Sequence, residues 1–344
     1  RRWCKEWHFR VGVHLLRGII GASEAGGQYS DLAEAILRTL WPKVVAEFSK
    51  KYGFPPGRGC IILGMGSLGI KSLHSSSDLD LIIIYDARGA EKSEGKRRLD
   101  VRLYYARLAQ SLVTAISAPM SEGRLYQVDM RLRPSGKQGP IATSWNYFQE
   151  YQQKEAWIWE HLALTRARVV LGASDLANEF EIFRVSLMGN RDYKKIVKAI
   201  TKMRLRIAAA KSKKLTFDAK FEVGGLLDVE LLAQLGRLIN GGSDRDIIGG
   251  LKACKDKNII DDVQFSSLVE AYHFFWSIRL VSKLLGKSLG DEPEIGSGAT
   301  KFIMRLTGKP SLQAIYLDLK ETTEEVAKIM NKVFPTKSGT NYEG

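Results

Sequence analysis

The sequence predicts an α/β (α+β) domain with a small mixed sheet, followed by an all-α helical bundle domain. In the first half of the chain, short apolar runs that end in glycine or proline alternate with a segment of helical period, which is typical of a sheet packed with helices. After residue 144, nearly every segment keeps an apolar stripe of helical period. These two patterns define the predicted fold class.

The N-terminal half supplies the predicted sheet. Helical spacing of apolar residues predicts helices within residues 1–50, and Ser30 with Asp31 has the composition of a helix start. Strands are predicted wherever an apolar or alternating run ends in a turn residue, at 60–66, 78–85 and 124–134. A helix is predicted between the last two strands, over 96–117.

Helices are predicted throughout the C-terminal half. The segments with an apolar stripe are 144–170, 174–189, 193–212, 226–239 and 265–286. Glycine-rich 241–250 is predicted to be a loop or a helix connection. We therefore expect an N-terminal helical segment, the α/β domain, the helical bundle and a frayed tail, at 1–50, 51–172, 173–335 and 336–344.

Charge and composition restrict the possible partners. The 344 residues carry a net charge of +14, which indicates an anionic partner such as nucleic acid, a nucleotide or an acidic protein surface. The basic residues are scattered rather than interleaved with aromatic residues, so a solvated basic surface explains the same charge. Charge alone does not choose among these partners.

The cysteines and the apolar runs indicate the cellular compartment of the protein. Cys4, Cys60 and Cys254 are far apart and odd in number, which favours a reducing cytoplasm, and none has the spacing of a zinc site. No apolar run approaches the roughly 18–20 residues of a membrane span. The chain starts without Met and shows no apolar signal core, so we expect a cytoplasmic piece of a longer protein.

A glycine turn follows the first predicted strand. In "GMGSLG", Gly66 and Ser67 could direct backbone N–H groups at an anion, with the start of a helix near Ser67 adding its positive end. Glycine turns after strands are common, so an ordinary turn remains an alternative.

Two carboxylates begin the second predicted strand. Asp78 and Asp80 are two residues apart, so both side chains project from one face of a strand, while Leu79, Leu81 and Ile83 occupy the other. Like charges this close repel unless a cation lies between them, and oxygen ligands suit Mg²⁺. A solvated strand end is the alternative for this pair taken alone.

The third predicted strand adds an acid where an apolar residue is expected. Asp129 lies between Val128 and Met130, and the two-residue period places Arg131 and Arg133 on its face. This row fits a metal ligand beside phosphate-binding arginines, or an ordinary row of salt bridges. The glycine turn, the carboxylate pair and the third acid together favour two-metal nucleotidyl transfer.

Three stretches carry a resemblance to a known family. They are "GMGSLG…SSSDLDLIIIYD", "VDMRLRPSGKQGPIATSWNYFQEYQQKEAWIWEHLALTRARVV" and "GGLLDVELLAQ". The glycine turn and the acids look like those of polymerase-β-like nucleotidyltransferases. From residue 1 to about residue 290 the chain resembles the bacterial glutamine synthetase adenylyltransferases, also called adenylyl-removing enzymes. Ile70 and Ser72 stand where that family usually has a glycine and a glutamate.

The resemblance implies an activity and its participants. Proteins of this family have two related halves, one that attaches AMP from ATP to a tyrosine of glutamine synthetase and one that removes it. The stretch "EAWIWEHLALTRARVV" is similar to the adenylylating, C-terminal half. The resemblance therefore implies an adenylyltransferase of nitrogen metabolism that uses ATP and Mg²⁺, with glutamine synthetase as protein substrate and the PII signal protein as a further candidate partner.

The resemblance also implies roles for individual residues. Asp78, Asp80 and Asp129 are expected to be catalytic and to hold Mg²⁺, with Asp129 as the proton acceptor. Asp228 and Glu230 are expected to support the site, although acids in the first turn of a helix are also favoured by its dipole. The nucleotide is expected to contact Gly66, Ser67, Lys71, Arg131 and Arg133.

The stretch "WIWEH" is predicted to be structural. Trp157 and Trp159 cannot share a helix face, and a lone histidine such as His161 is more often a packed residue than a catalytic one. Arg166 and Arg168 are expected to reach phosphate, and the alternative for one of them is an ion pair with Glu155 or Glu160.

Two other functions stay open. A deadenylylating half would use the same acids for phosphorolysis of AMP-tyrosine. A nucleic-acid-directed nucleotidyltransferase or binding module would use the basic surface, but the absence of a concentrated basic patch with stacking aromatic residues argues against nucleic acid as a partner.

Overall fold

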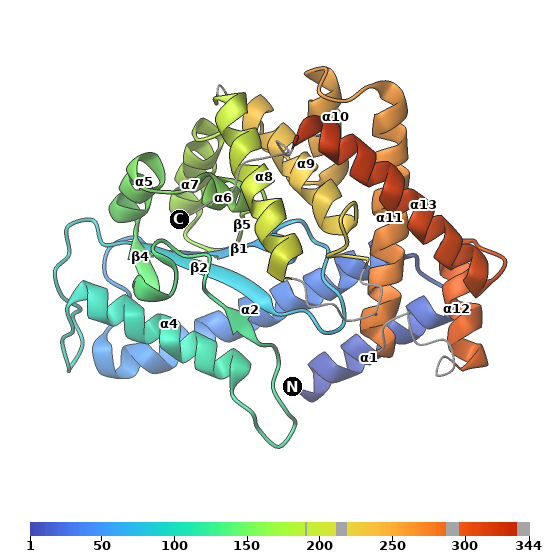
Figure 1. The fold of residues 1–344 in the computed structure, drawn as a ribbon. Coiled ribbons are helices and arrows are strands. Elements are labelled where there is room, and N and C mark those ends of the chain that lie inside the picture. Colours follow the sequence, from blue (N-terminus) through green and yellow to red (C-terminus); the bar gives the residue numbers. More distant parts are fainter. Residues whose placement is uncertain (190, 211–218, 287–295, 336–344) are drawn as a thin grey trace. The chain divides into compact units, whose positions relative to one another are not determined.

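The computed structural model describes residues 1–189, 191–210, 219–286 and 296–335, and the chain divides into two compact units (Figure 1). The first comprises Arg1–Leu15 and Glu24–Leu187, and the second comprises Leu16–Ser23 and Met188–Gly344. The first unit extends to Leu187, because the helix that follows residue 173 packs on the sheet. The predicted tail lies outside the described residues, and the four predicted domain ranges stay a prediction.

A small mixed sheet lies at the centre of the first unit, as predicted. Its strands are β1 (Gly59–Gly64), β2 (Leu79–Asp86), β3 (Val128–Asp129), β4 (Ala142–Ser144) and β5 (Arg168–Gly172). The order is β3-β2-β1-β5, and β4 also pairs with β2. Strand β1 is antiparallel to β2 and β5, whereas β2 is parallel to β3 and β4.

The apolar runs form the central strands because both of their faces are buried. Ile61 pairs with Ile84 and Ile62 pairs with Ile83, and all four side chains are buried. The helices of the first unit are α1 (Arg2–Arg17), α2 (Ala22–Tyr52), α3 (Gly66–Gly69), α4 (Val101–Ser117), α5 (Trp145–Lys154), α6 (Ile158–Leu164) and α7 (Ser174–Ser186). Helix α4 contacts β3 and β4, and α7 contacts β1 and β5 (Figure 1). The sheet is thereby fixed between helices.

The third strand is much shorter than predicted. Only Val128–Asp129 pairs with β2, because the chain turns at once: the Arg133 amide donates to the carbonyl of Met130 at 3.3 Å, and a 3-10 helix follows at Gly136–Gln138. The prediction that Arg131 and Arg133 continue the strand is therefore wrong.

Two further local predictions are corrected. Helix α2 begins at Ala22, and Ser30 lies inside it, where its hydroxyl donates to the carbonyl of Gly26 at 2.8 Å. The stretch 144–170 is not helical throughout, because Arg168–Gly172 pairs with β1 as β5. Long-range pairing decides β5, and helical spacing in the sequence does not reveal it.

The second unit is helical, as predicted. Its helices are α8 (Tyr193–Ala210), α9 (Leu226–Asn240), α10 (Ile247–Asp256), α11 (Asp262–Leu285), α12 (Ser297–Thr307) and α13 (Leu312–Val333). Glycines let α9 and α10 approach closely, since a Cβ on Gly236 would lie 2.1 Å from the carbonyl oxygen of Gly250. Within 241–250 the loop ends at Asp246, whose carboxylate accepts from the Gly249 amide at 2.7 Å and starts α10.

No helix in the described part of the chain is long and apolar enough to cross a membrane.

Replacing Gly69 with alanine is predicted to destabilise the chain by about 1–3 kcal/mol, because a Cβ there would lie 1.8 Å from the carbonyl oxygen of Arg166. Gly27→Ala in α2 is the control: nothing lies within 4 Å of its Cβ position, so we expect about 0.5–1 kcal/mol of stabilisation. Urea unfolding measures both changes. An unaltered midpoint for Gly69→Ala would contradict this packing.

Candidate functional site

The turn after β1 lies against the second strand. The Met65 amide donates to the carbonyl of Asp80 at 2.9 Å, which ties the turn to the start of β2. Gly66 has a φ of +51°, and a Cβ there would lie 2.7 Å from the Asp80 Oδ2 atom. Glycine is therefore required here both by the backbone conformation and by the space that the carboxylate occupies. Gly66 and Ser67 begin the short helix α3, as predicted.

Arg168 holds this turn from β5. Its Nε donates to the carbonyl of Gly69 at 3.0 Å, its Nη2 donates to the carbonyl of Leu68 at 2.9 Å, and Nη2 also pairs with Glu34. Arg168 pairs with neither Glu155 nor Glu160, because its partners are the turn and Glu34 of α2, and its predicted contact with phosphate stays a prediction. No local pattern reveals this role, since Glu34 and Arg168 lie far apart in the sequence.

Lys71 follows the turn in an unusual backbone conformation. Its φ is +56°, which is rare for a residue with a side chain, and its ammonium group lies 2.9 Å from Asp31 Oδ1. Both side chains are half exposed or more, so this ion pair is weak and could exchange for another anion. The predicted phosphate contact of Lys71 stays a prediction.

The three predicted acids lie on two neighbouring strands, with Asp78 and Asp80 around the start of β2 and Asp129 at the end of β3. In the parallel pair β2–β3, Asp80 is the register partner of Asp129, so their side chains share a face of the sheet. Asp78 directly precedes β2 and is exposed, whereas Asp80 and Asp129 are half-buried. The opposite face of β2 is core, as predicted, because Leu79 and Leu81 are fully buried.

Arg131 supplies the positive charge beside these acids. Asp129 accepts from the Arg131 backbone amide at 2.8 Å and from its Nε at 2.7 Å, and Nη2 lies 2.5 Å from the same carboxylate. These hydrogen bonds hold the pKa of Asp129 below its ordinary value. The pKa of Arg131 is raised chiefly by Asp129 and further by Asp80 and Asp78. One guanidinium thus interacts with all three carboxylates.

Arg133 is bound by the loop that follows β3. It donates from Nη1 to the carbonyl of Met130 at 2.7 Å, from Nε to Gly139 at 3.1 Å and from Nη2 to Lys137 at 3.2 Å. Burial lowers the pKa of this arginine. It fixes the loop that carries Arg131, and its predicted contact with phosphate stays a prediction.

The donor set suits a hard cation. Carboxylate oxygens are the ligands that Mg²⁺ prefers, and Gly66 leaves open the space beside the Asp80 carboxylate. Within the described residues, no three His, Cys, Asp or Glu side chains are gathered around a single point as a metal site would require. Because Asp129 is hydrogen-bonded to Arg131, a cation has to compete with this arginine for the carboxylate.

Comparison with known proteins places the chain in a family. The model of the family described as glutamate-ammonia ligase adenylyltransferase matches residues 1–182, which is more than half of the chain. The chain belongs to the glutamate-ammonia ligase adenylyltransferase family. A second model, described as GlnD PII-uridylyltransferase, matches residues 194–334.

Curated relatives of this family match almost the whole chain. The bifunctional glutamine synthetase adenylyltransferase/adenylyl-removing enzyme of Brucella suis is 34% identical over 342 residues, which is 97% of this chain and 34% of that protein. The proteins of the same name from Mesorhizobium japonicum and Rhizobium meliloti are 35% and 36% identical, over 95% of this chain. The chain therefore spans about a third of the length of these relatives.

Asp228 and Glu230 belong to the second unit of this adenylyltransferase-family chain. Both are buried on α9, and Asp228 accepts from Nε and Nη2 of Arg204, each at 2.8 Å, and from the Gly224 amide at 2.8 Å. This bidentate pair ties α8 to the start of α9. That these two acids support the nucleotide site stays a prediction.

The prediction for "WIWEH" is half right. Glu160 accepts from the Tyr151 hydroxyl and from the Trp157 amide, each at 2.9 Å, and His161 Nε2 donates to the carbonyl of Gln152 at 2.8 Å. Both residues are buried and structural. The prediction of packing is wrong for Trp157 and Trp159, which are 71% and 43% exposed.

Arg131→Gln is predicted to raise the pKa of Asp129 toward its ordinary value, because it removes the charged hydrogen bonds to that carboxylate. The pKa of Asp129 is lowered by folding, so its contribution to stability is present above the ordinary pKa and is lost as pH falls through the lowered one. Carboxyl NMR titration of aspartate-labelled protein measures the shift. Arg98→Gln, at an exposed site, is the charge-matched control. The same Asp129 pKa in both variants would contradict the pairing of Arg131 with Asp129.

Proposed function

We propose that this chain is an adenylyltransferase that moves AMP from ATP to a tyrosine hydroxyl of glutamine synthetase and releases pyrophosphate. One observation carries the proposal: Asp80 and Asp129 are register partners on β2 and β3, and Asp80 lies beside the glycine turn at Gly66. Membership in the adenylyltransferase family supports the substrate class. Because the chain spans about a third of its relatives, the activity of the whole protein is part of the proposal.

Each site residue has a proposed role. Asp78, Asp80 and Asp129 would hold Mg²⁺, which supplies positive charge to the phosphates and favours the phenolate of the attacking tyrosine. The backbone N–H groups of Gly66 and Ser67 would contact the triphosphate. Asp129 is an ionised carboxylate at neutral pH, since its pKa is lowered, and is the proposed proton acceptor for the tyrosine hydroxyl.

The arginine and lysine side chains would respond to the nucleotide. Arg131 would leave Asp129 as phosphate oxygens and the cation arrive, and its exposed side chain is free of packing that would oppose this movement. Lys71 would exchange its exposed pairing with Asp31 for phosphate. Arg133 would contact phosphate from the loop after β3, the loop that also positions Arg131.

The partners and location are proposals as well. The PII signal protein is a proposed partner because the model of a PII-uridylyltransferase matches residues 194–334. A cytoplasmic location is supported by the state of the cysteines, since Cys4, Cys60 and Cys254 are all free and buried.

The names of the relatives favour one alternative, the adenylyl-removing reaction. The same acids would then support attack of phosphate on AMP-tyrosine, with ADP as product. Incubation of adenylylated glutamine synthetase with this chain and phosphate separates the two reactions, because only the adenylyl-removing reaction releases ADP.

Asp78→Asn is predicted to lower AMP transfer by about 100-fold or more. The substitution removes a proposed ligand of Mg²⁺, whose positive charge would stabilise the transition state of the reaction. Its fold should persist, since Asp78 is exposed and one of two neighbouring like charges is lost. Intact-mass analysis of glutamine synthetase incubated with ATP, Mg²⁺ and each variant measures the AMP-sized gain. Asp256→Asn, an exposed position on α10, is the control. No gain with a folded, ATP-binding wild-type chain would contradict the proposal.

A further inference from the structure

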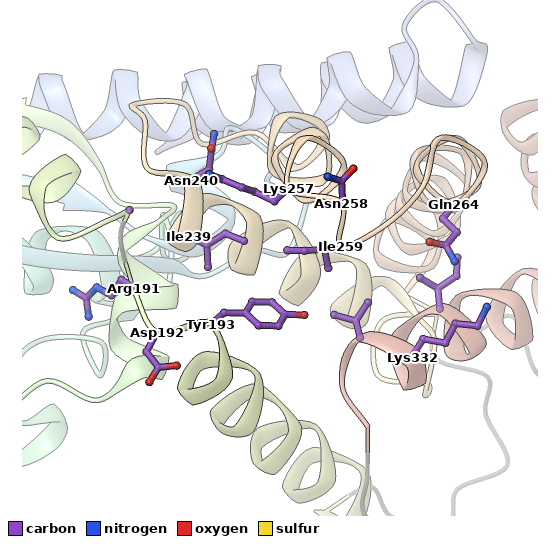
Figure 2. A pocket seen from close by; sticks show the side chains of 13 residues that line it. Arg191, Asp192, Tyr193, Ile239, Asn240, Lys257, Asn258, Ile259, Gln264 and Lys332 are labelled. Atoms are coloured by element: carbon purple, nitrogen blue, oxygen red, sulfur yellow. The ribbon is translucent and has the colours of Figure 1, made fainter.

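A large cavity lies within the second, helical unit (Figure 2). It has a volume of about 990 Å³, and its walls come from the start of α8, the end of α9, the turn between α10 and α11, the first turn of α11 and the end of α13. This size is in the range of small-molecule sites in proteins. None of the residues predicted from the sequence for nucleotide transfer lines it.

The lining of the cavity has an excess of positive charge. Arg191, Lys257 and Lys332 line it, and the one acid in the lining is Asp192. Asp192 is already engaged, because it accepts from the Lys195 amide at 3.2 Å and lies 3.9 Å from the Lys195 ammonium group. Over the described ranges, Lys257 and Lys332 make no ion pair, so their charges are available to a ligand.

The neutral polar groups of the cavity also offer donors. The Gln264 side-chain oxygen accepts from the Asp261 amide at 3.1 Å, so its NH₂ group is the part that remains for a ligand. Burial raises the pKa of Tyr193, whose ring lies in the middle of the view in Figure 2, and this phenol therefore stays protonated at neutral pH. These donors match a ligand rich in acceptor oxygens.

The turn that follows α10 forms one edge of the cavity. Asn258 has a φ of +54°, a conformation that asparagine tolerates better than most residues, and its amide donates to the carbonyl of Lys255 at 2.8 Å. The next amide, of Ile259, donates to the carbonyl of Cys254 at 2.9 Å. This turn ends α10 and places Lys257 and Ile259 in the same lining.

We propose that this cavity binds a small organic anion that carries a carboxylate or phosphate group, a ligand beyond the substrates of adenylyl transfer. Lys257, Lys332 and the Gln264 NH₂ group are the proposed contacts of its oxygens. The apolar side chains of Ile239, Ile259 and Val333 line the same space and would contact its carbon skeleton.

Calorimetric titration of the whole chain tests the proposal, with inorganic phosphate and citrate as the two probes. EDTA in the buffer removes cations that would bring phosphate to the aspartates of the first unit. The test variant is Lys257→Gln with Lys332→Gln. The control is Lys252→Gln with Lys328→Gln, which changes the same net charge on α10 and α13 at exposed positions outside the cavity. Urea unfolding verifies that each variant is folded, and Lys332→Gln alone is the reserve variant.

We expect saturable binding of at least one probe to the wild type and to the control, and a loss of affinity of about tenfold or more in the test variant. Binding of phosphate alone would identify a phosphate ester as the ligand class, and binding of citrate alone would identify a carboxylate. No saturable binding of either probe, or equal affinities for test and control variants, would overturn the proposal. Neither result depends on adenylyl transfer.

Discussion

The candidate site depends on the parallel pairing of β2 with β3. This pairing sets Asp80 opposite Asp129, and the Leu79 amide donates to the carbonyl of Gln127 at 2.9 Å to fix the register. A slip of one residue would turn Asp129 to the other face of the sheet and bring an apolar neighbour into its place. Because β3 is only Val128–Asp129, its surroundings have to hold it, and buried Tyr126 and Met130 on either side do so.

The carboxylates of Asp78, Asp80 and Asp129 repel one another in this arrangement, and the positive charge of Arg131 offsets the repulsion. Arg131, two residues after Asp129, forms three contacts with that carboxylate, one from its backbone amide and two from its guanidinium, and the guanidinium interacts with Asp78 and Asp80 as well. The tight turn after β3 makes these contacts possible, and the carbonyl contacts of Arg133 stabilise the turn. The loop after β3 thus explains why Asp129 is ionised. It also explains why a cation has to compete with Arg131 for the Asp129 carboxylate.

The sequence predicts the parts of this site that depend on local pattern. The buried runs of β1 and β2, the glycine at position 66 and the spacing of Asp78 and Asp80 all follow from period and residue type. The length of β3 does not, because the strand ends at a turn in which the Arg133 side chain binds the carbonyls of Met130, Lys137 and Gly139, and the two-residue period of the sequence does not reveal those contacts. Strand β5 and the clamp from Arg168 depend on pairing across the chain, which no short window contains.

The most direct measurement of the site is Mn²⁺ binding to the ATP-loaded chain by electron paramagnetic resonance. Wild type is compared with Asp80→Asn, Asp129→Asn and the double variant. If the register pair holds one cation, each single variant should bind about tenfold more weakly or worse, and the double variant should lose little more, because both side chains serve the same ion. Wild-type affinity in Asp129→Asn, or losses that simply add in the double variant, would contradict a shared cation at these strands.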